Sequence, residues 1–79
     1  MVETRIAPSY RVSKAGTIKF RGSALDCVVR DLSITGAAIE VTGPAGIPES
    51  FILVMPDEGL RLPCQVVWRK PFRIGVKFD

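Results

Sequence analysis

The chain has 79 residues, of which 47% are hydrophobic and 24% charged, and its formal net charge is +3. This length allows one domain, residues 1–79, and the composition is that of a globular protein rather than a disordered chain. No apolar run reaches the length of about 18 residues that a membrane span needs, and the N-terminus lacks the apolar stretch of a secretory signal, so we expect a cytoplasmic protein.

The N-terminal residues lack the regular pattern of the rest of the chain. Residues 1–12 show no alternation of apolar and polar side chains, and we expect a flexible arm that precedes a barrel over residues 13–79. Arg5 and Arg11 lie on this arm, and Pro8 biases it toward an extended conformation.

The remainder alternates with the period of half-buried strands. Alternating runs occupy residues 17–20, 25–30, 37–42, 60–69 and 73–78, and the uniformly apolar run 51–55 predicts a strand that is buried on both sides or lies against a tail. Segments rich in Gly, Pro and Ser separate these runs. About six short strands without a helical period predict an all-β, six-stranded antiparallel barrel, because closure removes exposed edges. The sequence ends at Asp79, directly after the last strand, so we expect no C-terminal helix.

The chemistry of the side chains offers little for catalysis or metal binding. There is no His, and Cys27 and Cys64 each lie among alternating apolar residues, which favours small core side chains over a disulfide in a reducing compartment. Two cysteines are too few for a structural zinc site. Without a nucleophile–base pair or a glycine-rich phosphate loop, we expect no enzyme and no cofactor. Pro63 cannot donate to a ladder, so we expect it at an edge or bulge.

Basic residues of the predicted C-terminal hairpin share the outward phase: Arg61, Arg69, Arg73 and Lys77. Such a stripe can follow a phosphate backbone. The aromatic platforms of single-strand binders are missing, however, because Trp68 and Phe78 share the inward phase with the core. We therefore do not expect nucleic acid as a partner.

One hexad between two β-prone runs carries polar groups at a distinctive spacing: Asp31-Leu32-Ser33-Ile34-Thr35-Gly36. On one interpretation its sole role is to reverse the chain, since Gly and Asp are common in turns. It can also present an acid, a hydroxyl and a glycine to a ligand. The two interpretations are compatible, because a turn can display its polar groups on the rim of a barrel.

Taken with the preceding arginines on an all-β chain, the hexad resembles the PilZ domain, the bacterial receptor module for cyclic diguanylate. That family pairs an N-terminal Arg-x-x-x-Arg with Asp/Asn-x-Ser-x-x-Gly on a six-stranded barrel, and Asp31, Ser33 and Gly36 match the second motif. The resemblance continues through residues 64–69 and 73–78, which look like the last two strands of the family.

The first motif departs from the family pattern. With Pro8 as the anchor, Arg5 takes the position of the first arginine and Ser9 that of the second, and Arg11 could reach in as a substitute. Alternatively, Arg11 aligns with the second arginine, and Ala7 then replaces the first. The resemblance therefore implies a ligand site made of Arg5, Ser9, Arg11, Asp31, Ser33 and Gly36.

The residue types suit that ligand. A guanidinium matches O6 and N7 of guanine, and an ionised Asp31 can accept from the N–H groups of the Watson–Crick edge. Ser33 can donate its hydroxyl, and Gly36 permits close approach. The resemblance implies a receptor for cyclic diguanylate without catalytic activity, which acts on a downstream protein partner that the sequence does not identify. The alternative is a degenerate PilZ-type protein-interaction module that does not bind nucleotide.

Overall fold

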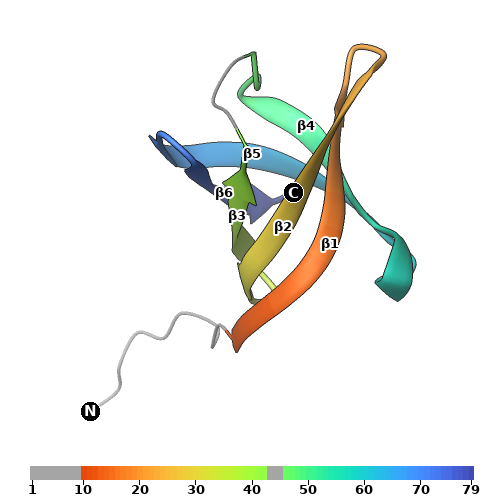
Figure 1. The fold of residues 1–79 in the computed structure, drawn as a ribbon, viewed down its shortest axis with the longest axis vertical. Coiled ribbons are helices and arrows are strands. Elements are labelled where there is room, and N and C mark those ends of the chain that lie inside the picture. Colours follow the sequence, from red (N-terminus) through yellow and green to blue (C-terminus); the bar gives the residue numbers. More distant parts are fainter. Residues whose placement is uncertain (1–9, 43–45) are drawn as a thin grey trace.

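The computed structural model describes residues 10–42 and 46–79, which form a closed barrel with the strand order β1-β2-β3-β6-β5-β4 (Figure 1). All neighbouring strands are antiparallel, so the predicted fold class is confirmed. The elements are β1 (Tyr10–Phe20), β2 (Ser23–Leu32), β3 (Gly36–Val41), β4 (Ser50–Met55), the 3-10 turn η1 (Pro56–Glu58), β5 (Leu60–Lys70) and β6 (Arg73–Phe78). No helix in these two ranges is long and apolar enough to cross a membrane.

The start of the barrel differs from the predicted boundary. β1 begins at Tyr10, so the last three residues of the expected arm, 10–12, belong to the first strand. Arg11 is therefore part of the sheet, where it pairs with Asp31 of β2. Arg5 and Ser9 lie outside the described residues.

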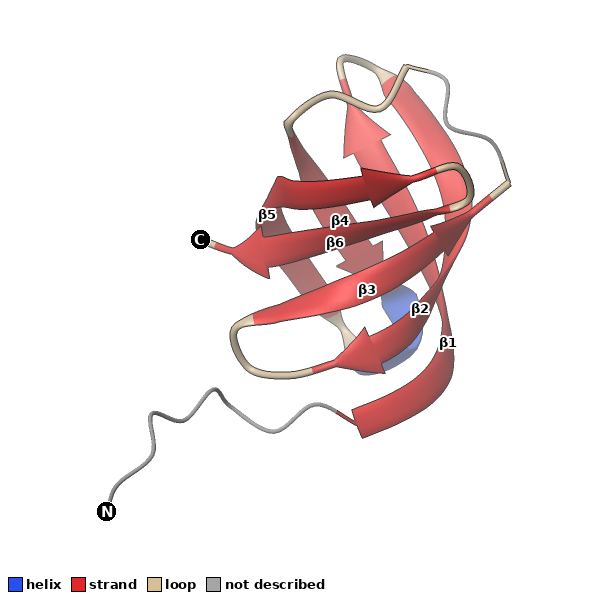
Figure 2. Ribbon diagram, turned by 90° about the vertical axis from the view of Figure 1, so that its left-hand side faces the viewer, coloured by secondary structure: helices blue, strands red, loops and turns tan. Residues whose placement is uncertain are grey.

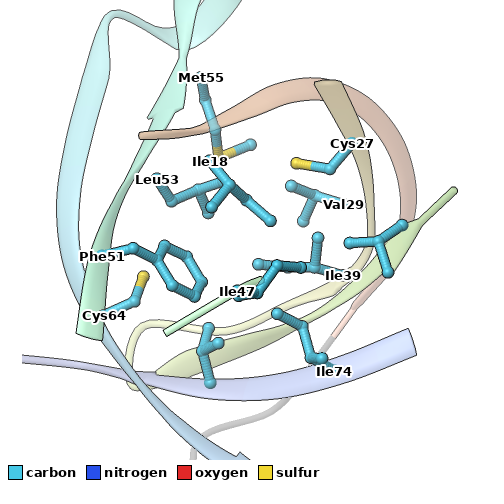
Figure 3. Packing of buried hydrophobic residues seen from close by; sticks show 12 residues of the cluster. Ile18, Cys27, Val29, Ile39, Ile47, Phe51, Leu53, Met55, Cys64 and Ile74 are labelled. Atoms are coloured by element: carbon cyan, nitrogen blue, oxygen red, sulfur yellow. The ribbon is translucent and has the colours of Figure 1, made fainter. Parts of the chain in front are cut away.

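The inward side chains of all six strands fill the barrel. Figure 3 shows this core, whose buried members are Ile18, Cys27, Val29, Ile39, Val41, Ile47, Phe51, Leu53, Met55, Cys64, Ile74 and Val76. In β4 the burial alternates, with Ile52 and Val54 only half-buried, so the prediction of a strand buried on both sides is wrong. β4 pairs with β1 and β5 through its backbone, while its second face lies on the outside of the barrel.

An irregularity in β5 reverses the orientation of its last residues. The ladder with β6 passes from Val66 opposite Val76 to Trp68 opposite Gly75, which leaves Val67 as an extra residue. Because side chains alternate between the faces, this bulge turns Trp68 outward, and 41% of its surface is exposed. The predicted inward orientation of Trp68 is therefore wrong, whereas Phe78 does pack against the core.

The same bulge moves Arg69 away from the outward face, contrary to the prediction. Arg69 lies opposite the buried Ile74, and its Nη1 donates to the carbonyl oxygen of Ile47 at 2.9 Å. Its Nη2 also lies 3.6 Å from Oε2 of Glu49. Arg69 thus ties the C-terminal hairpin to the segment that leads into β4.

Pro63 occupies the position that its missing N–H requires. It is exposed and lies opposite Ile52 of β4, while the paired part of β6 ends at Phe78, opposite Cys64. Beyond this pair, the amide of Asp79 donates to the Pro63 carbonyl oxygen at 2.9 Å. The expected edge-like position of Pro63 is confirmed.

The two cysteines are free thiols within the core, as the sequence predicted. Figure 3 shows Cys27 and Cys64 on opposite sides of the cluster. Burial raises the pKa of Cys27 to about 12 and that of Cys64 to about 11, because the apolar surroundings disfavour the thiolate. Both thiols are therefore neutral at physiological pH.

These shifts predict a loss of stability at alkaline pH. Since both folded pKa values lie above the ordinary value of 9.0, the unfolded chain loses its thiol protons first, and the free energy of unfolding falls as the pH rises above about 9. Urea denaturation between pH 7 and 10.5 measures this decline. The double variant Cys27→Ala, Cys64→Ala should show a flatter decline, and an equal slope in both proteins would contradict the assignment.

Candidate ligand-binding site

The hexad forms the turn between β2 and β3, at the lower left in Figure 2. The Ser33 hydroxyl oxygen accepts from the amides of Thr35 and Gly36, each at 3.2 Å, and the amide of Ser33 donates to the Gly36 carbonyl oxygen at 2.9 Å. The same hydroxyl is 3.2 Å from that carbonyl oxygen, to which it can donate. Ser33 therefore stabilises the turn with the group that the family resemblance assigns to a ligand.

Gly36 is required by the packing of β3 on β6. A Cβ at this position would lie closer than 3 Å to the Val76 carbonyl oxygen, and because that oxygen belongs to the backbone of β6, it cannot move aside. Gly36 thus permits a close approach, as predicted, and the groups that approach each other here are the backbones of β3 and β6.

A row of side chains crosses the outer face of the barrel from the hexad. Arg11 lies opposite Asp31, Asp31 opposite Ala38, Ala38 opposite Gly75, and Gly75 opposite Trp68. Directly opposed residues of neighbouring strands point to the same face. The row therefore presents a guanidinium and a carboxylate at one end, two small residues in the middle and an indole at the other end.

Trp68 lies against the sheet because Gly75 has no side chain. A Cβ on Gly75 would come closer than 3 Å to Nε1, Cε2 and Cζ2 of the indole. The Lys70 ammonium is 5.5 Å from the centroid of the ring, a loose cation–π contact. The indole therefore occupies a fixed place on the outer face, with part of its surface open to a ligand.

The turn and the row enclose one hollow of about 310 Å³. Its lining residues are Asp31, Ser33, Thr35, Gly36, Ala37, Ala38, Trp68, Val76 and Lys77. In the part of the chain that the structure describes, no ion-pair partner contacts Asp31, whereas the neighbouring Arg30 lies 3.7 Å from Glu40. The carboxylate of Asp31 lines the hollow, and the ammonium of Lys77 supplies a positive charge nearby.

The described residues also form two larger hollows. One of about 960 Å³ lies between the β1–β2 hairpin and the β4–β5 pair, away from the hexad. Another of about 530 Å³ is lined almost entirely by apolar residues, including Tyr10, Ile34 and Leu60, and it meets the hexad only at Ser33 and its neighbours. The largest hollow also carries charged, hydroxyl and aromatic groups, among them Lys19, Ser50 and Phe51. The smallest one is therefore selected by its place at the Asp-x-Ser-x-x-Gly turn, and not by size or polarity.

The structure brings together most of the site residues predicted from the sequence. Asp31, Ser33 and Gly36 line one hollow, and Arg11 lies beside Asp31 on the neighbouring strand. Sequence reasoning missed Trp68 and Lys77, which line the same hollow. Trp68 could have been found from Gly75, because a residue without a side chain on the neighbouring strand leaves room for an indole on the outer face.

Comparison with known proteins shows the family of this chain and a solved structure with a similar fold. The family profile described as "PilZ domain" matches residues 3–79, and the chain therefore belongs to the PilZ domain family. A crystal structure of the Borreliella burgdorferi PlzA protein in complex with c-di-GMP has a similar fold, with a TM-score of 0.75 and 22% sequence identity. The similarity covers 96% of this chain and 34% of PlzA, so this chain corresponds to about a third of that protein. No curated protein matches the chain.

Substitution of Gly36 and of Gly75 by alanine should destabilise the protein to different extents. Gly36→Ala should lower the free energy of unfolding by about 1–3 kcal/mol, because the new methyl group meets a backbone oxygen. Gly75→Ala should cost less stability, because the indole can swing out into water, and the fluorescence of Trp68 should shift to longer wavelength. Thermal unfolding and emission spectra of both variants test this. Equal loss of stability, or an unshifted spectrum for Gly75→Ala, would contradict it.

Proposed function

We propose that this chain binds cyclic diguanylate and acts as a receptor domain without catalytic activity. The observation that carries the proposal is the row from Arg11 and Asp31 to Trp68, which borders the hollow at the Asp-x-Ser-x-x-Gly turn. Membership of the PilZ family and the c-di-GMP complex of PlzA support the choice of ligand. At 22% identity, the likeness to PlzA supports the fold, so the ligand assignment depends on the residues of this chain.

Each part of the site has a partner on the ligand. A guanine can stack on the indole of Trp68, because every base presents a π-face, and such a stack is worth about 1–3 kcal/mol. The Asp31 carboxylate accepts from the N–H donors of the Watson–Crick edge of guanine. Arg11 and Lys77, on either side of the hollow, supply the positive charge that two phosphates require.

A hollow of about 310 Å³ is at the lower end of the range for small-molecule pockets. It suits one base of the dinucleotide, and the rest of the ligand must be covered from outside. Arg5 and Ser9 precede Tyr10, the residue at which β1 begins, so the segment that carries the first arginine motif starts beside the site. In this proposal, Arg11 supplies a guanidinium from the sheet, and Arg5 supplies a second one from that segment.

The setting of the receptor is part of the same proposal. A family of bacterial second-messenger receptors suggests a cytoplasmic protein whose ligand changes its contacts with a downstream protein. In this proposal the conformational change starts at Ser33 and its neighbours, because the turn that would contact the ligand leads directly into β3.

Removal of the Asp31 carboxylate should weaken binding of cyclic diguanylate. Isothermal titration should show that Asp31→Ala lowers the affinity by about 10- to 150-fold, which corresponds to the loss of charge-assisted hydrogen bonds of about 1.5–3 kcal/mol. Asp57→Ala, which removes an exposed carboxylate from η1, is the matched control and should bind as the wild type does. The sole tryptophan, Trp68, gives a second readout, since its fluorescence should change on binding.

The alternative, a degenerate interaction module, predicts a different result. The wild-type chain would then give no heat at about 100 μM ligand, a concentration about a hundred times a micromolar dissociation constant. That result would overturn the proposed function. Ser33→Ala is less informative than Asp31→Ala, because the Ser33 hydroxyl also holds the turn.

Restoring the second arginine should tighten binding. If Pro8 anchors the alignment, Ser9→Arg adds a bidentate guanidinium–guanine pair and raises the affinity by about 5- to 150-fold. Ser13→Arg, which places an arginine at an exposed position of β1 outside the motif, serves as the control for charge alone. Equal affinities of the wild type and Ser9→Arg would instead assign the role of the second arginine to Arg11.

A further inference from the structure

The outer face of the β5–β6 hairpin extends beyond the hollow, and it adds Lys70, Phe72 and Arg73, which the proposed function does not use, to Trp68 and Lys77, which it does. We define the hairpin face by Trp68, Lys70, Arg73 and Lys77 of the two strands and Phe72 of the turn that joins them. The sequence argued against nucleic acid because Trp68 was expected inside the barrel, and the bulge in β5 removes that argument. We propose that the hairpin face binds single-stranded nucleic acid without strong sequence preference.

Two exposed aromatic rings provide the stacking platforms. Trp68 is 41% exposed and Phe72 is 59% exposed. From Trp68, β5 continues for two residues to Lys70, about 7 Å at 3.3 Å per residue, and Phe72 follows in the turn beyond it. A flexible strand can place two of its bases on these rings in turn, and stacking of this kind tolerates any base.

Cations lie between and beside the two rings. Lys70 and Arg73 are directly opposite each other, two ladder steps from the pair of Trp68 and Gly75 toward the turn, and therefore on the same face. Lys77 follows on the same face of β6, two residues beyond Gly75. A phosphate backbone that runs along β6 would therefore meet a positive charge on both sides of the indole.

Two acidic residues offset part of this charge. Asp31 lines the hollow with Trp68 and Lys77. Glu40 lies opposite Arg73 on β3, and its carboxylate is 3.7 Å from Nε of Arg30, which offsets its charge. Arg69 does not belong to the face, because it contacts Ile47 and Glu49. The local balance of the hairpin face is therefore cationic.

The position of Trp68 favours a single strand over a duplex or a membrane. A duplex hides the faces of its bases, so it could use only the cations. A membrane-inserting hairpin needs its apolar groups at the tip, where Phe72 lies, whereas the indole packs against Gly75, two ladder steps before the last pair of the hairpin. A ring that is held in place in this way is suited to stacking, and its low mobility reduces the entropy lost on binding.

Fluorescence anisotropy with a labelled twelve-residue oligothymidylate at about 50 mM salt tests the proposal on the full chain. Trp68→Ala should weaken binding by about 5- to 150-fold, as expected for one lost base–aromatic stack, and Trp68→Phe should retain most of the affinity. Phe72→Ala should also weaken binding. Tyr10→Ala removes a ring that is 66% exposed at the first residue of β1, outside the hairpin face, and this variant should bind as the wild type does.

The charge of the hairpin face predicts the salt dependence. With three contributing cations, the logarithm of the affinity should fall against the logarithm of the salt concentration with a slope of about −2. Lys77→Gln should reduce the slope by about 0.7, and Lys19→Gln, on the distant β1–β2 hairpin, should leave it unchanged. A slope near zero for the wild type would overturn the proposal.

Further results would also overturn it. One is the absence of any anisotropy change up to about 100 μM protein at low salt. Another is equal affinity of the wild type, Trp68→Ala and Phe72→Ala for the oligonucleotide. A third is binding to anionic phosphatidylserine vesicles but not to the oligonucleotide. Because Trp68 belongs to both sites, cyclic diguanylate should compete with the oligonucleotide, a statement that rests on the proposed function. Direct titration of each ligand alone separates failure of one assignment from failure of the other.

Discussion

Between Val66 and Trp68 the ladder of β5 with β6 gains one unpaired residue, Val67, and this bulge determines which side chains of the C-terminal hairpin face water. Before the bulge, Cys64 points into the core and Val66 packs against it. After it, the phase is reversed, so that the indole lies outside and Arg69 contacts Ile47 and Glu49. The outer aromatic ring, the tie to the segment before β4 and the outward position of Lys70 all follow from this one extra residue.

The candidate site lies on the outside of the barrel because the inside is full. Apolar side chains fill the interior of the barrel, so polar groups that could bind a ligand lie on the outer face and in the turns. There, the small side chain of Ala38 leaves space between Asp31 and the indole, which covers Gly75. A planar base suits such a space, and a ligand that lies on an open face depends on a further segment to cover it.

Several residues have both a structural and a proposed functional role. The Ser33 hydroxyl holds the turn that would contact the ligand, and Gly36 lets β3 approach β6 at the edge of the hollow. Trp68 is shared between the site for a dinucleotide and the face proposed for a longer strand. Such overlap allows one ligand to influence the other without a large conformational change, since both require the same ring.

The sequence by itself determined the barrel, the turn at the hexad and most of its core, because period-two alternation and breakers act locally. It also identified Asp31, Ser33 and Gly36 as neighbours, since they lie within six residues. Only the tertiary structure decided the orientation of Trp68 and Arg69, and only it placed Arg11 beside Asp31. The reason is physical: a bulge is defined by the partner strand, and cross-strand pairs join residues that the sequence separates.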